Sequence, residues 1–155
     1  MKLSSSISVL LADDDKDDCL FFQDILTEIP LSTTFHAVYD GEYLIRYLAD
    51  KGNDLPDVIF LDLNMPRKNG YTCLDELKSN ENFNQIPVII FSTSFDDETA
   101  HQLYNKGAHY YICKPSDYDQ LRRIIESALQ LISSGKTTQP PKEKFLLGGL
   151  RMILL

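Results

Sequence analysis

Short apolar runs alternate with amphipathic stretches along most of the chain. The runs are rich in β-branched and aromatic residues and occupy residues 7–11, 33–38, 58–61, 88–91 and 110–112, of which 33–38 is the weakest. They lack polar alternation, as is typical of strands buried on both faces of a parallel sheet. Between them lie segments with helical spacing, such as the stripe Phe22, Ile25, Leu26 and Ile29. The pattern predicts an α/β domain of five strand–helix units.

Polar residues mark where several helices begin. Asn69 and Asp117 are candidate N-caps, and Gln120 completes a capping box with Asp117. Asp96 and Asp97 lie where carboxylates favour the positive end of a helix. Strands that alternate with helices need crossover connections, so we expect a parallel sheet with helices on both faces. In such sheets binding groups gather at the carboxyl ends of the strands.

Four of the predicted strands end in polar residues that suit one site. The first runs into Asp13 and Asp14, the third into Asp62, the fourth into Ser92 and the fifth into Lys114. Three carboxylates this close repel one another and raise each other's pKa unless a cation joins them. Because the donors are oxygens, Mg²⁺ is the natural ion. With the metal and the lysine in place, Asp62 could attack a phosphoryl group as a nucleophile.

Each of these motifs also has a simpler interpretation. The run DDDKDD at 13–18 could be a solvated acidic loop, Asp62 and Ser92 could be helix caps, and Lys114 could mark an ordinary strand end. An EF-hand loop is excluded because Asp18 stands where a glycine is required and no glutamate closes the loop. Matching groups at four strand ends favour a joint site.

Four stretches resemble the receiver domain of bacterial two-component response regulators, of the stand-alone chemotaxis-regulator type. They are VLLADDD (9–15), VIFLDLNMPRKNG (58–70), PVIIFSTS (87–94) and GAHYYICKP (107–115). The resemblance covers roughly residues 7–132. It implies a flavodoxin-like (βα)5 fold, a doubly wound five-stranded parallel sheet in the order 2-1-3-4-5.

The resemblance also implies a role for each site residue. Asp62 is expected to accept the phosphoryl group, while Ser92 and Lys114 contact it. Ser92 and Tyr111 are expected to form the switch. The expected Mg²⁺ ligands are Asp13, Asp14, Asp62 and the backbone carbonyl of Asn64.

Composition narrows the classes of partner. The chain has 155 residues, 23 acidic and 15 basic, with a net charge of −8, which argues against non-specific binding to nucleic acid. The N-terminal apolar run meets carboxylates too early for a signal peptide or a membrane-spanning helix. Cys19, Cys73 and Cys113 lack paired spacing and are expected to be buried thiols in a reducing compartment. We therefore expect a cytoplasmic protein with no membrane contact.

Residues 1–133 are interpreted as the receiver domain and residues 134–155 as a linker with an apolar tail. The tail residues Leu146, Leu147, Leu150, Ile153 and Leu154 could form one face of a short helix, which Gly148 and Gly149 would weaken. Packing on the tail's own domain or on a second copy is expected rather than membrane contact.

The function predicted from these features is that of a single-domain response regulator. It would accept a phosphoryl group from a histidine kinase or a histidine phosphotransfer protein and signal to a downstream protein, with a homodimer as one possible contact. The output face is expected on the fourth helix, fifth strand and fifth helix. Self-phosphotransfer and self-dephosphorylation would be its only enzymatic activities.

Three alternatives to this function stay open at this point. One is a receiver-shaped scaffold that is never phosphorylated. Another is an aspartyl-phosphate phosphatase, whose second aspartate is replaced here by Asn64. A flavodoxin-like small-molecule binder is disfavoured, because the carboxylates after the first strand have the wrong sign for a phosphate cradle.

Overall fold

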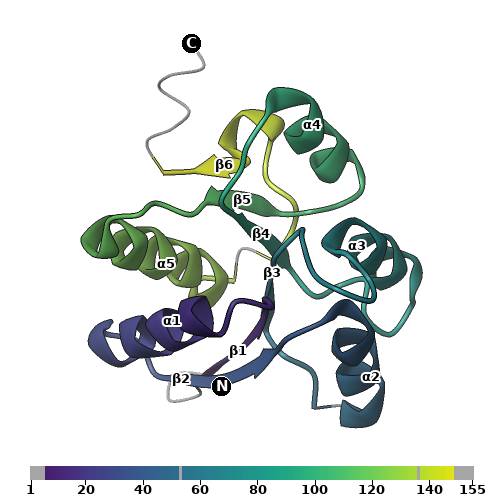
Figure 1. Ribbon diagram of the computed structural model, residues 1–155, viewed down its shortest axis with the longest axis horizontal. Coiled ribbons are helices and arrows are strands. Elements are labelled where there is room, and N and C mark those ends of the chain that lie inside the picture. Colours follow the sequence, from purple (N-terminus) through teal and green to yellow (C-terminus); the bar gives the residue numbers. More distant parts are fainter. Residues whose placement is uncertain (1–5, 53, 136, 149–155) are drawn as a thin grey trace.

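A parallel sheet with helices on both faces forms the centre of the protein. The computed structural model describes residues 6–52, 54–135 and 137–148. The sheet has the order β2-β1-β3-β4-β5-β6 (Figure 1). Its strands are β1 (Ile7–Ala12), β2 (Thr33–Val38), β3 (Val58–Leu61), β4 (Val88–Ser92), β5 (Tyr110–Cys113) and β6 (Leu146–Leu147). The α-helices are α1 (Lys16–Glu28), α2 (Gly41–Lys51), α3 (Gly70–Ser79), α4 (Asp97–Asn105) and α5 (Tyr118–Ser133), and a short 3-10 helix, η1, spans Lys142–Lys144.

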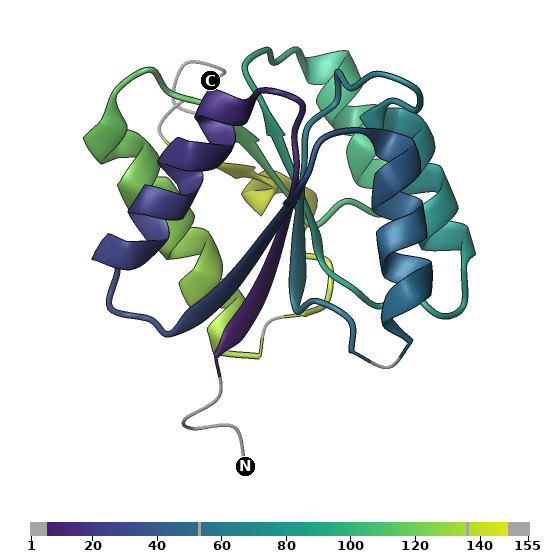
Figure 2. The same ribbon diagram turned by 60° about the horizontal axis from the view of Figure 1, so that its bottom comes forward.

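Two apolar cores lie on opposite faces of the sheet. Helices α1 and α5 cover one face, and α2, α3 and α4 cover the other (Figure 2). On the first face the ring of Phe22 meets the rings of Phe60 and Phe91 edge-on, with centroids 4.9 Å and 5.5 Å away. Both faces of β3 and β4 are buried, which explains why the sequence of these strands is apolar without alternation.

The polar residues expected at helix starts do cap them. The Asn69 side chain accepts a hydrogen bond from the Thr72 amide at 3.0 Å, and the Asp117 carboxylate accepts one from Gln120 at 3.1 Å. Asp96 caps α4 in the same way. The cap of α1 is Asp15, whose carboxylate accepts from the amides of Asp17 and Asp18. Within the acidic run 13–18, Asp15 therefore stabilises the start of α1.

The predicted order of the first five strands is confirmed, but the sheet gains a sixth strand. Residues Leu146 and Leu147, expected on a short helix, form β6 beside β5. Phe145 and Leu146 are buried against the α4 face, so burial of apolar side chains outweighs the weak helical pattern. Leu150, Ile153 and Leu154 lie outside the described residues. The proposed division at residues 133 and 134 stays a prediction.

Membrane contact was not expected of this chain. Within residues 6–52, 54–135 and 137–148, none of the helices has the length and apolar character needed to span a bilayer.

Candidate functional site

The predicted site residues meet at the carboxyl edge of the sheet. Backbone hydrogen bonds fix their places: the Asp62 amide donates to the carbonyl of Ala12 at 2.9 Å, and the Lys114 amide donates to that of Ser92 at 2.7 Å. Because β3 also pairs with β4, the ends of β1, β3, β4 and β5 lie side by side. The convergence inferred from the strand ends is present in the structure.

Three carboxylates form the floor of this site. Asp13, Asp14 and Asp62 each have an oxygen that lies within 4.8 Å of the other two. Asp13 is fully buried and Asp62 is 7% exposed, whereas Asp14 is exposed. Oxygen ligands gathered this closely, with one side open to solvent, fit a hard divalent cation such as Mg²⁺.

Burial and mutual repulsion perturb these acids. Burial, with a further contribution from the charge of Asp13, raises the pKa of Asp62 to about 6. Burial also raises the pKa of Asp13, although its hydrogen bond with Lys114 opposes that rise. A bound cation would relieve both effects.

Asn64 lies close to the expected acceptor. Its backbone amide faces Asp62 Oδ1 at 3.5 Å, which places the start of the β3–α3 loop against the carboxylate. The expected role of the Asn64 carbonyl as a metal ligand stays a prediction.

Lys114 is held by two carboxylates, one of which was not predicted from the sequence. Its Nζ donates to Asp13 Oδ2 at 2.6 Å and to Asp18 Oδ2 at 2.8 Å, and its side chain is 9% exposed. Burial alone would lower the pKa of Lys114, but these bonds raise it overall, so the side chain stays an ammonium. Asp18 belongs to the first turn of α1. Its pairing with Lys114 depends on where that helix begins, which no local pattern around Asp18 indicates.

Ser92 and Tyr111 are joined through one loop. Ser92 is fully buried at the end of β4, and its Oγ faces the amide of Ser94 at 3.4 Å. The hydroxyl of Tyr111 donates to the carbonyl of Ser94. Phe95 packs edge-on against the Tyr111 ring at 5.2 Å between centroids. The two predicted switch residues thus contact the same residue of the β4–α4 segment, Ser94.

The backbone at Gly70 lies very close to the backbone of Asp62. Gly70, the first residue of α3, donates its amide to Leu63 at 2.9 Å. A Cβ at Gly70 would lie 2.3 Å from the carbonyl oxygen of Asp62. Glycine is therefore required at this position, and the loop from 62 to 70 is held tightly against the helix start.

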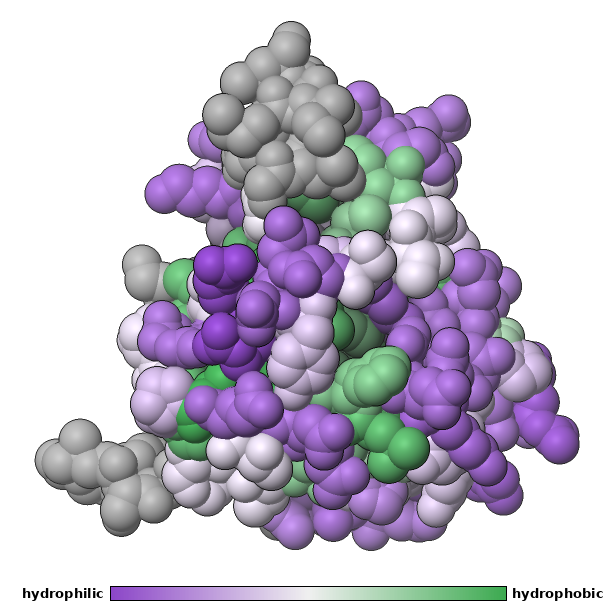
Figure 3. Space-filling model, turned by 60° about the vertical axis from the view of Figure 1, so that its left-hand side comes forward, coloured by the Kyte–Doolittle hydropathy of each residue, from purple (hydrophilic) through white to green (hydrophobic). Residues whose placement is uncertain are grey.

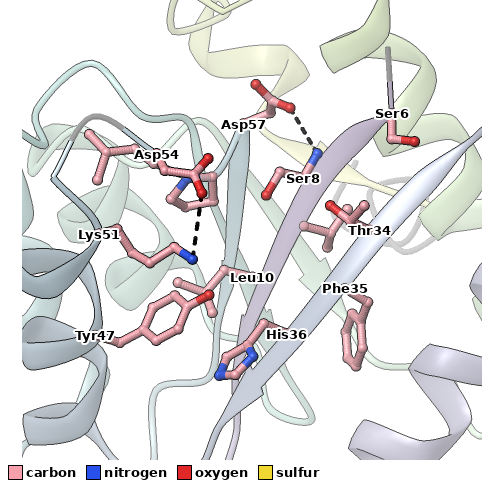
Figure 4. A pocket seen from close by; sticks show the side chains of 13 residues that line it. Ser6, Ser8, Leu10, Thr34, Phe35, His36, Tyr47, Lys51, Asp54 and Asp57 are labelled. Atoms are coloured by element: carbon pink, nitrogen blue, oxygen red, sulfur yellow. Dashed lines mark hydrogen bonds and ion pairs between the residues drawn. The ribbon is translucent and has the colours of Figure 1, made fainter. Parts of the chain in front are cut away.

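A hollow of about 570 Å³ lies between α2 and the strands β1 and β2, away from the carboxyl edge of the sheet (Figure 4). Its charged groups already have partners: Lys51 pairs with Asp54 at 3.7 Å, and Asp57 accepts from the amide of Ser8 at 2.8 Å. The residues that line it are separate from those of the carboxylate site, so the hollow takes no part in the chemistry at the strand ends.

The family model of the response regulator receiver domain matches residues 9–126. The protein is similar to the response regulator Rcp1 of Synechocystis, with 27% identity over 122 residues that cover 76% of this chain and 83% of Rcp1. The probable methanogenesis regulatory protein FilR2 of Methanothrix harundinacea is 26% identical over 121 residues, covering 76% and 78%.

Solved structures agree in fold. The phosphorylated cyanobacterial phytochrome response regulator RcpA superposes with a TM-score of 0.77 and 30% identity over 88% of this chain and all of RcpA. The Mn²⁺-bound form of Rcp1 gives a TM-score of 0.73 and 25% identity, covering 87% and 99%. This chain belongs to the response regulator receiver domain family.

Proposed function

We propose that this protein accepts a phosphoryl group on Asp62 from a phosphohistidine of a histidine kinase or phosphotransfer protein. The observation that carries the proposal is the convergence of three carboxylates, a buried hydroxyl and a buried ammonium at one strand edge. Among these carboxylates Asp62 suits the role of acceptor, because Asp13 is already paired with Lys114 and Asp14 is exposed.

In the proposed reaction an Oδ of Asp62 bonds to phosphorus while the bond from phosphorus to the donor imidazole breaks. The imidazole keeps the electron pair and takes a proton from water. Mg²⁺ held by Asp13, Asp14, Asp62 and the Asn64 carbonyl would offset the negative charge of the carboxylates and of the phosphoryl oxygens. Lys114, with two of its three N–H groups engaged, has one left for a phosphoryl oxygen.

The acyl phosphate carries about −1.5 to −2 charges, on the model of other phosphorylated residues, where the ionised carboxylate carried one, and it brings three acceptor oxygens. Ser92 is the neutral donor expected to turn toward them. Because Tyr111 hydrogen-bonds to the loop that follows Ser92, a shift of that loop would repack Tyr111. Hydrolysis of the acyl phosphate by water would end the signal.

The surface beside the site suits a docking donor protein. Helix α1 exposes Leu20 by 59% and Phe21 by 51%. Phe21 also lines a hollow of about 550 Å³, together with Lys114 and Tyr118. Figure 3 shows the side of the molecule that carries α1 and α5, where apolar side chains emerge between polar ones. Apolar side chains next to the acceptor support an approach of the donor from this side.

Intact mass after incubation with acetyl phosphate tests the proposal. Wild-type protein should gain one phosphoryl group in Mg²⁺ and none in EDTA, and hydroxylamine, which cleaves acyl phosphates, should remove it. Asp62→Asn should gain nothing, whereas the exposed control Asp50→Asn should behave as wild type. Folded wild-type protein that gains no phosphoryl group would instead support an unphosphorylated scaffold, and turnover of a phosphomonoester would support a phosphatase.

A further inference from the structure

A C-terminal strap, made of residues 137–147, leads from the end of α5 to α4, on the other face of the sheet. It runs along α4 and ends as β6 beside β5 (Figure 1, yellow). The strap lies beyond residues 9–126, which the family model matches. It covers the α4 and β5 part of the face on which output contacts were expected.

Polar contacts fasten the first part of the strap to the end of α4. The Gln139 side-chain amide donates to the carbonyls of Tyr104 and Ala108, both at 2.7 Å. The Tyr104 hydroxyl donates to the carbonyl of Pro140 at 2.7 Å. His109 Nε2 lies 2.9 Å from the carbonyl of Thr137. These four contacts tie residues 137–140 to the last turn of α4 and to the loop that leads into β5.

The second part of the strap rests on Tyr111. Phe145 is 4% exposed, and its ring meets those of Tyr104 and Tyr111 edge-on at 5.4 Å and 6.1 Å between centroids. The Tyr111 amide donates to the carbonyl of Phe145 at 2.9 Å. The strap is therefore attached to the expected switch residue by its backbone and by its side chain.

Tyr111 consequently lies between the site and the strap. Its hydroxyl reaches the Ser94 carbonyl on one side, and its ring meets Phe145 on the other. The side chain is fully buried. In a close-packed interior it cannot follow a shift of the β4–α4 loop and leave its contact with Phe145 unchanged. The attachment of β6 is also short, since only two residue pairs join it to β5.

We propose that phosphorylation of Asp62 controls whether the strap is docked. The strap packs against α4 and β5 in the unphosphorylated protein, and it loosens when phosphorylation makes Tyr111 repack. This inference rests on the proposed phosphorylation of Asp62. Loosening would free the outer backbone edge of β5 and the apolar surface of Tyr104 and Tyr111. A sheet edge beside an apolar surface fits a partner that supplies an extended apolar segment as an added strand.

Hydrogen exchange on the full-length chain tests the proposal directly. Peptides covering residues 108–113 and 137–148 would be followed in Mg²⁺ with and without acetyl phosphate, and intact mass of the same sample would give its phosphorylated fraction. We expect amides in these peptides to exchange at least about tenfold faster in phosphorylated protein, the signature of local opening. Asp62→Asn treated identically should show no change.

A reciprocal measurement uses the linkage between strap and site. If phosphorylation loosens the strap, weakening the strap must favour the phosphorylated state by the same factor. Beryllofluoride, a phosphoryl analogue, should bind with Mg²⁺ at least about threefold more tightly to Gln139→Ala and Phe145→Leu than to wild type. Gln130→Ala is the matched control for Gln139→Ala, because Gln130 is exposed on α5 and its side-chain amide donates to Glu126, outside the strap. Its affinity should stay at the wild-type value.

The outcomes separate this proposal from the phosphorylation itself. No phosphoryl gain would refute the proposed function. A fully phosphorylated sample whose strap exchanges as before would leave that function intact and overturn the role of the strap. Phosphorylated protein that doubles in mass while the strap stays protected from exchange would also overturn the role of the strap. The strap would then serve as a contact between two copies.

Discussion

Replacing Asp62 with Asn should stabilise the metal-free protein, and by an amount that depends on pH. The pKa of Asp62 rises from 3.8 to about 6 because the carboxylate is buried next to Asp13. Each pKa unit corresponds to about 1.4 kcal/mol, so ionised Asp62 lowers the free energy of unfolding by roughly 3 kcal/mol above pH 6. The asparagine side chain carries no charge, and its oxygen can still accept the amide of Asn64.

Proton binding to the folded and unfolded protein determines at which pH Asp62→Asn is more stable than wild type. Below about pH 4 the Asp62 side chain holds its proton in both states, so the variant has no advantage. Between about pH 4 and pH 6 only the folded protein holds the proton, and wild-type stability falls as the pH rises. Asp62→Asn should therefore match wild type at low pH and exceed it by roughly 3 kcal/mol at pH 7.

Urea unfolding in EDTA, repeated across this pH range, measures the difference. Asp50→Asn, which removes an exposed carboxylate, controls for the net charge of −8. Saturating Mg²⁺ should reduce the advantage of Asp62→Asn, because the ion binds and stabilises the folded wild type. Equal stability of Asp62→Asn and wild type at pH 7 in EDTA would refute the reasoning that burial and repulsion strain this site.

Three further changes test other parts of the structure. Lys114→Met leaves the buried carboxylate of Asp13 without its cation and should lower the free energy of unfolding at pH 7 by about 3 kcal/mol in urea titrations; an unchanged value would mean that Asp13 is solvated. Gly70→Ala places a Cβ 2.3 Å from the Asp62 carbonyl oxygen and should cost about 2–3 kcal/mol in the same titrations while slowing phosphoryl gain; wild-type values for both would contradict the tight loop. Burial raises the pKa of Cys19 and Cys73 to about 12, so mass spectrometry after iodoacetamide at pH 8 should find them unmodified until urea unfolds the chain, and the partly exposed Cys113 alkylated first. Alkylation of Cys19 or Cys73 before Cys113 would argue against their burial.

The sequence predicts the sheet well because its strands are buried on both faces. Continuous apolar runs such as 58–61 leave no competing interpretation once helical segments lie between them. The site is predictable for the same reason: a residue directly after a parallel strand has its place fixed by the sheet. Asp13, Asp62 and Lys114 were found in this way, although their roles stay proposals.

The features that could not be predicted depend on contacts between distant segments. Asp18 pairs with Lys114 across 96 positions, and that pairing depends on where α1 begins, which Asp15 sets through its cap. Strand β6 has two residues, too few for a period of two to appear. Its pairing depends on Phe145 being buried against Tyr104 and Tyr111, a tertiary contact without a local signature.

The charges at the site indicate where the switching motion must occur. Lys114 is bound to Asp13 and Asp18, and its third N–H can meet a phosphoryl oxygen without breaking either bond. In the proposed cycle we therefore expect Lys114 to keep both of these bonds. Ser92 is neutral and buried, and its loop is tied to Tyr111 through Ser94. In the proposed cycle, the motion thus belongs to the β4–α4 loop, and the side chain it displaces is the one on which the strap rests.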